Sequence, residues 1–204
     1  MIHQFFIDKR PQNGLTYEEY FNQFEEKIKT TDTAALNEEE KKLFEYSKLN
    51  LHRTNRIHKS YKVSDELCEL LKEIDEPQLW MAITEDWCGD SAQNLPYIAQ
   101  FTKCNPKIDL RIVLRDANPD IMDLYLTHGK SRSIPKIVAF DQNGNELFQW
   151  GPRPKAAQQL VEDAKAAGKS KDEFIEELHL WYGKNRGKDI EEEFKEIVKL
   201  QLAD

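Results

Sequence analysis

Residues 78–91 read QLWMAITEDWCGDS, and this stretch decides the fold. Residues 78–84 form an apolar run of strand length, which leads directly to Cys88. A helical stretch follows and ends near Cys104. A cysteine between a strand and the start of a helix lies where unpaired N–H groups and the helix dipole stabilise a thiolate. Cys88 is therefore the first candidate for chemistry.

The segments that follow alternate between strand and helix. Residues 109–115 are rich in branched side chains and predict a second strand. Residues 134–140 predict a third strand, and an Asn-Gly turn at 143–144 joins it to a fourth strand over 146–150. This order favours a parallel βαβ pair with an antiparallel hairpin at its edge. The predicted fold class is α/β, with a mixed four-stranded sheet and helices on both faces.

Helical segments flank this region on both sides. Residues 1–60 are predicted to be a helical N-terminal extension, because Thr16 and Glu19 form a capping-box pattern before aromatic residues at helical spacing. Residues 61–168 would form the central α/β domain. Residues 169–204 are charged and predict a helical C-terminal extension that packs against this domain.

Composition excludes several classes of function. The chain has 204 residues, with 29 Lys and Arg against 37 Asp and Glu, and its net charge of −8 speaks against binding nucleic acid or an anionic membrane. No apolar run approaches the roughly 20 residues that span a bilayer. The first ten residues lack the pattern of a secretory signal. Three cysteines are an odd number and too few for a disulfide framework, so we expect a cytoplasmic protein.

The residues around Cys88 act on its thiol in opposite directions. Gly89 permits a tight turn beside the sulfur, and Ser91, one helical turn further on, can donate a hydrogen bond to it. Asp90 opposes a second negative charge, so the pKa of the thiol stays open at this point. The alternative is a buried and inert cysteine.

The chain here resembles the thioredoxin superfamily over roughly residues 61–168. The resemblance rests on the stretch EDWCGDS at 85–91, on Pro96 in the following helix, and on Ile134 and Pro135 before the third strand. The two prolines lie at offsets from Cys88 that are similar to those of thioredoxin. Gly151, after the hairpin, resembles the family's glycine beside the active site.

The resemblance implies a site. Cys88 would be the nucleophile, with Ser91 as its catalytic partner. Pro135 would be a cis-proline opposite the sulfur. Residues expected to contact the substrate are Trp87, Gly89, Asp90, Ile134, Pro135 and Arg153.

Two departures from the family change the expected chemistry. Ser91 stands where the family has its second, resolving cysteine, and Ala82 stands where thioredoxin has a buried acid. A Cys-x-x-Ser site can attack a protein disulfide or exchange with a low-molecular-weight thiol, but an outside thiol must release the mixed disulfide. The sequence is similar to a little-characterised subgroup with a Trp-Cys-Gly-Asp core and a helical N-terminal extension.

Neither remaining cysteine is a strong candidate to resolve a disulfide at Cys88. Cys104 lies about 20 Å away along the helix, beyond the distance of about 7 Å between Cα atoms that a disulfide needs. Cys68 lies on an earlier helix, where apolar neighbours favour burial. Both are expected to be buried or out of reach.

Other charged residues give weaker signals. Arg132 and Ser133 would lie beside the sulfur, and Arg153 could offset Asp90. The basic cluster at 52–59 is interpreted as a solvated helix face. The five histidines lack metal-ligand spacing and no phosphate-binding loop is present, so neither a metal nor a cofactor is predicted.

Two functions remain open from the sequence. One is monothiol thiol–disulfide exchange or deglutathionylation by Cys88. The other is a non-catalytic module that binds a peptide in the groove beside Pro135, or a protein partner through its helical extensions.

Overall fold

The structure is a computed structural model that describes residues 2–203. Its elements in chain order are α1 (Gln4–Ile7), β1 (Leu15–Thr16), α2 (Tyr17–Thr30), a 3-10 turn (Thr33–Ala35), α3 (Glu38–Ser60), α4 (Asp65–Lys72), β2 (Gln78–Thr84), α5 (Gly89–Thr102), β3 (Ile108–Leu114), α6 (Pro119–Met122), β4 (Lys136–Asp141), β5 (Glu146–Trp150), α7 (Lys155–Ala166), α8 (Lys171–Asn185) and α9 (Lys188–Ala203).

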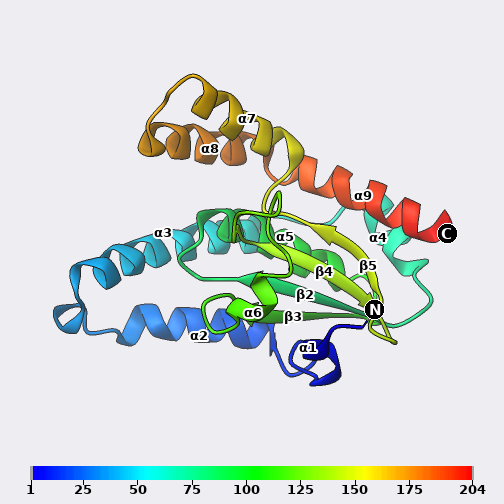
Figure 1. The fold of residues 1–204 in the computed structure, drawn as a ribbon. Helices are drawn as coiled ribbons and strands as arrows, with labels where there is room; N and C mark the ends of the chain where they lie inside the picture. Colours follow the sequence, from blue (N-terminus) through cyan, green and yellow to red (C-terminus); the bar gives the residue numbers. More distant parts are fainter. Residues whose placement is uncertain (1, 204) are drawn as a thin grey trace.

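The α/β fold predicted from the sequence is confirmed (Figure 1). The sheet has the strand order β1-β3-β2-β4-β5. β2 pairs with β3 in parallel, whereas β4 pairs antiparallel with both β2 and β5. Residues 61–168 supply the four predicted strands, and β1, from the predicted N-terminal extension, adds a fifth strand antiparallel to β3. β1 has only two residues, and so short a strand shows no alternation of apolar and polar residues that could be recognised in the sequence.

Each face of the sheet carries its own hydrophobic core. On one face, α3, α4, α5 and α9 pack against side chains such as Trp80 and Ile137. On the other face, Phe5 of α1 and the apolar residues of α6 cover Met81 and Phe140. Successive strand residues point to opposite faces, so β2 and β4, which are buried on both sides, read as continuous apolar runs.

The flanking helices begin where local capping predicts. Thr16 and Glu19 form the predicted capping box of α2, and Asn37 and Glu40 form another at α3. α3 then packs along α5, the helix that follows Cys88. α8 packs with α7, and together they form a lobe at the top of the view in Figure 1, above α5. Helices outside the central domain thus flank the candidate site on two sides.

Candidate functional site

Cys88 lies at the first turn of α5, immediately beyond the end of β2. It is the N-cap residue of the helix, and its Sγ donates a hydrogen bond to the Ile134 carbonyl oxygen at 3.2 Å. The Ile134–Pro135 peptide bond is cis, as predicted. The loop before β4 therefore lies directly opposite the sulfur. The side chain of Cys88 is buried, with 9% of the residue exposed.

Gly151 lies against the backbone of Pro135. Its φ of +113° lies in the region that favours glycine, and a Cβ at this position would overlap the carbonyl oxygen of Pro135. Trp87 stands on the other side of the cysteine, where its ring lies 4.6 Å from the guanidinium of Arg115. The segments that carry the resemblance to thioredoxin thus converge on one thiol.

The environment of Cys88 keeps its thiol protonated. Burial raises the pKa of Cys88 to about 11, and the carboxylate of Asp90 acts in the same direction. The Ser91 hydroxyl and the N–H groups of Ser91 and Asp90 lower it, because they favour the thiolate. The sequence left the pKa of this thiol open, and in the folded protein the net shift is upward. Desolvation raises the pKa of Cys88 by more than the hydrogen bonds at the helix start lower it.

Ser91 occupies the place of a resolving cysteine. Its side chain is 2% exposed, and its Oγ has no hydrogen-bond partner among residues 2–203. The neighbouring thiol donates to Ile134 instead, so the hydroxyl of Ser91 is free to donate once a thiolate forms. Ala82, in place of the family's buried acid, is fully buried in β2.

Asp90 is held by partners from two other elements. Arg153 donates to its Oδ2 from Nε at 3.1 Å and from Nη2 at 2.5 Å, and the hydroxyl of Tyr182 donates to Oδ1 at 2.7 Å. Burial lowers the pKa of Arg153, but the charge of Asp90 more than offsets this and the net shift is upward. Arg153 thus lies where the sequence suggested, opposite Asp90. Tyr182 was missed, because a tyrosine within a charged helix gives no local signal.

Three further side chains near the start of α5 were also missed. A Cβ on Gly89 would lie 2.9 Å from His179 Cε1 and 3.6 Å from Arg53 Nη1, and one on Gly183 would lie 4.0 Å from Arg56 Nη1. The interpretation of this part of α3 as a solvated face is wrong for Arg53, which is half-buried. Burial and the two arginines lower the pKa of His179 to about 4, so its imidazole is neutral at pH 7.

The side chains of Arg132 and Ser133 make their hydrogen bonds with residues other than Cys88. Arg132 is about half exposed and forms two hydrogen bonds of 2.7 Å with the carboxylate of Asp123. The hydroxyl of Ser133 pairs with that of Ser131. The loop before Pro135 accepts the hydrogen bond of Cys88 through the backbone carbonyl of Ile134.

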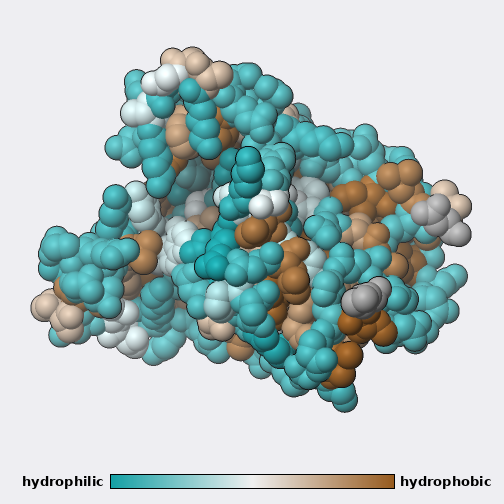
Figure 2. Space-filling model, in the orientation of Figure 1, coloured by the Kyte–Doolittle hydropathy of each residue, from teal (hydrophilic) through white to brown (hydrophobic). Residues whose placement is uncertain are grey.

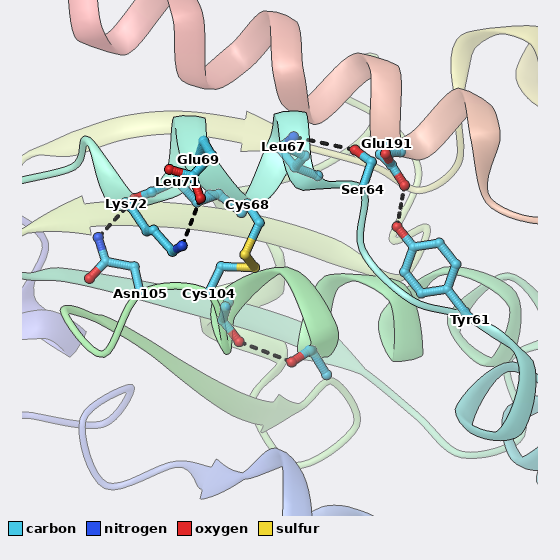
Figure 3. The surroundings of a disulfide bond; sticks show 12 residues. Tyr61, Ser64, Leu67, Cys68, Glu69, Leu71, Lys72, Cys104, Asn105 and Glu191 are labelled. Carbon is cyan, nitrogen blue, oxygen red and sulfur yellow. Dashed lines mark hydrogen bonds and ion pairs between the residues drawn. A yellow bond between two sulfur atoms is a disulfide. The ribbon is translucent and has the colours of Figure 1, made fainter.

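The other two cysteines form a disulfide with each other (Figure 3). Cys68 in α4 bonds Cys104, just beyond the end of α5, and their Cα atoms are 5.3 Å apart. From the sequence, each cysteine was considered only as a partner for Cys88, and a bond between the two was not predicted. Cys88 remains a free cysteine.

Replacing Asp90 by asparagine is expected to lower the pKa of Cys88. The substitution removes a negative charge that disfavours the thiolate and leaves the positive charge of Arg153 unpaired beside it. The midpoint of the alkylation rate against pH should shift downward. The control is Asp172→Asn, which removes the charge of an exposed aspartate in α8 and should leave the midpoint unchanged. An equal midpoint in both variants would contradict the influence of Asp90 on the sulfur.

The fold and the site define a thioredoxin-like protein. The family model Thioredoxin_9, described as thioredoxin, matches residues 36–165, and the chain belongs to this family. The match begins within the helical N-terminal segment, so α3 is covered by it. No curated protein sequence matches the chain.

Two solved structures resemble the chain over nearly its whole length. A protein of unknown function from Pseudomonas aeruginosa has 18% identity and a TM-score of 0.53, with 93% of this chain and 96% of that one covered. An HIV epitope scaffold has 18% identity and a TM-score of 0.55, with coverage of 91% and 98%. At this identity the likeness concerns the fold alone.

Among residues 2–203, no helix is both long and apolar enough to cross a membrane. The same residues hold no group of three or more His, Cys, Asp or Glu side chains arranged to bind a metal ion.

Proposed function

We propose that the protein performs thiol–disulfide exchange through Cys88. The observation that carries this proposal is the position of the thiol at the start of α5, facing the carbonyl that precedes cis-Pro135, in a chain of the thioredoxin family. Family membership and geometry support the proposal together. Neither would suffice alone, because one fold serves many functions.

The proposed step transfers one half of a substrate disulfide to the protein. The Cys88 thiol loses its proton, and the thiolate attacks one substrate sulfur. A bond forms between this sulfur and Sγ while the substrate S–S bond breaks. The departing thiolate takes up a proton, so one thiol and one disulfide are consumed and one of each is formed. Ser91 cannot resolve the mixed disulfide, and an outside thiol must release it.

The protonated resting thiol limits the rate of this step. At a pKa of about 11, roughly one thiol in ten thousand is ionised at pH 7. A substrate must therefore bind in a way that favours the thiolate. The same burial and raised pKa favour the second candidate function, a binding module that uses the groove beside Pro135 and does no chemistry.

Mass spectrometry after incubation with glutathione disulfide separates the two functions. We expect one glutathione adduct per chain, because Cys88 is free and the other two cysteines are bonded to each other. Cys88→Ser should abolish the adduct. The matched control is the double variant Cys68→Ser/Cys104→Ser, because replacing only one member would release a new thiol. If no adduct forms even at alkaline pH, Cys88 is inert and the binding function is favoured.

Restoring a second cysteine at the site is expected to change the product. In Ser91→Cys, the new sulfur lies one helical turn from Cys88, within reach for an internal disulfide. Mild oxidation should then remove two thiols per chain, and the glutathione adduct should be transient. A stable adduct on Ser91→Cys would contradict the assignment of position 91 as the resolving position.

The location of the protein remains a separate prediction. The cytoplasmic assignment rested in part on the small and odd number of cysteines. The Cys68–Cys104 bond is of a type that is rare in the cytosol and typical of oxidising compartments. Thiol exchange at Cys88 does not depend on either location.

A further inference from the structure

Two arginines from α3 reach the start of α5, beside the reactive thiol. A Cβ on Gly89, the residue after Cys88, would lie 3.6 Å from Arg53 Nη1. Arg56, one turn further along α3, donates to Gln93 Oε1 at 3.2 Å, on the same side of α5. His179 of α8 lies at the same place, where its Cε1 would be 2.9 Å from a Cβ on Gly89. Figure 2 shows the surface hollowed between the lobe of α7 and α8 and the lobe of α2 and α3.

Neither arginine is neutralised by the protein. Among residues 2–203, no carboxylate lies within 4.0 Å of Arg53 or Arg56, although acids outnumber bases in the chain. Their hydrogen-bond acceptors are uncharged: Asn50 Oδ1, at 2.9 Å from Arg53, and Gln93 Oε1. Asp90 attracts Arg53 through space, but its own carboxylate is already paired with Arg153 and Tyr182. Most of the N–H donors of both guanidinium groups are left without a protein acceptor.

Arg53 is half-buried and Arg56 is exposed, so the two guanidinium groups form one positive patch that solvent can reach. Burial lowers the pKa of Arg53 to about 10, and the nearby charge of Arg56 acts in the same direction. A planar guanidinium matches a carboxylate in two parallel hydrogen bonds, and such charge-assisted bonds are stronger than neutral ones. A carboxylate is the group whose shape and charge match the open donors of these two arginines.

We propose that Arg53 and Arg56 bind a carboxylate of a small disulfide substrate and thereby place its sulfur against Cys88. The inference rests on the proposed function and names its substrate class. The substrate is small because 9% of Cys88 is exposed and α8 packs against Gly89. It is anionic because the open donors at the entrance are those of two arginines. Arg153 is not part of this site, since Asp90 occupies it.

The test compares the reaction of Cys88 with three small disulfides. Glutathione disulfide carries carboxylates, 2-hydroxyethyl disulfide is neutral and cystamine is cationic. We expect glutathione disulfide to form the adduct at least about tenfold faster than the neutral reagent, and cystamine to react most slowly. In Arg53→Gln/Arg56→Gln the advantage of glutathione disulfide should disappear. The readout is the ratio of the two rates within one variant, because the loss of two positive charges also acts on the thiol and changes both rates together. Circular dichroism reports that the variant is folded.

The matched control is Lys42→Gln, which removes one positive charge from an exposed position of α3, far from the site. It should retain the full preference for glutathione disulfide. If the wild-type protein reacts equally fast with the anionic, neutral and cationic reagents, the preference for an anionic substrate is rejected, whereas thiol exchange is retained. If the preference persists in Arg53→Gln/Arg56→Gln, the two arginines are not its origin and the inference is overturned.

A separate measurement keeps this inference independent of the proposed chemistry. S-methylglutathione has the same carboxylates and a sulfur that cannot exchange, and its binding can be followed by calorimetry. We expect binding that Arg53→Gln/Arg56→Gln weakens at least about tenfold and that Lys42→Gln leaves unchanged. Absence of binding to the wild-type protein would overturn the arginine site. Binding without any adduct would instead retain the site and reject thiol exchange.

Discussion

Removing the Cys68–Cys104 disulfide is expected to lower the free energy of unfolding by about 4 kcal/mol. The bond closes a loop spanning 36 residues, and the entropy that such a loop loses in the unfolded chain gives this magnitude. The double variant Cys68→Ser/Cys104→Ser should show this loss in urea unfolding, with little change in secondary structure.

The fold should survive because other contacts hold the same junction. Asn105, beside Cys104, donates from Nδ2 to the carbonyl oxygens of Leu71 at 2.8 Å and Ile74 at 2.9 Å, at the end of α4 (Figure 3). Reduction of the wild-type protein should reproduce the loss of stability, whereas the same reductant should leave the double variant unaffected. Equal unfolding midpoints for the oxidised wild type and the double variant would mean that the bond does not form in solution.

Phe194→Ala in α9 is expected to destabilise the protein by about 3–5 kcal/mol, the usual range for truncating a buried phenylalanine. Phe194 is fully buried, and its ring centroid lies 5.6 Å from that of Trp80, 5.2 Å from that of Phe101 and 5.6 Å from that of Trp150. These rings belong to β2, α5 and β5. The C-terminal extension therefore completes the core of the central sheet.

The matched control lies on the same helix. Leu200 is 69% exposed, and Leu200→Ala should change stability by less than about 0.5 kcal/mol. Thermal or urea unfolding of both variants measures the difference. If Phe194→Ala is as mild as Leu200→Ala, α9 is an appendage and the sheet is stable without it.

The sequence alone predicted those features that depend on neighbouring residues. The strands at 78–84, 134–140 and 146–150 were recognisable because apolar runs and a turn signal are local patterns. The capping box at Thr16 and the cis bond at Pro135 also followed from short stretches, one read from its residues and the other from a resemblance. Even the position of Arg153 near Asp90 could be anticipated, because a known fold brings those segments together.

Contacts between distant segments were decided only by the tertiary structure. Helical periodicity tells which residues share a face but not which element that face meets. Cys68 therefore gave no sign of meeting Cys104, and Arg53 gave none of meeting the start of α5. The state of the thiol depends on the same assembly: the sequence places Cys88 at a helix start, which favours a thiolate, whereas burial raises its pKa to about 11. Desolvation of the sulfur depends on all the atoms packed around it, and the residues next to Cys88 in the sequence do not determine which atoms those are.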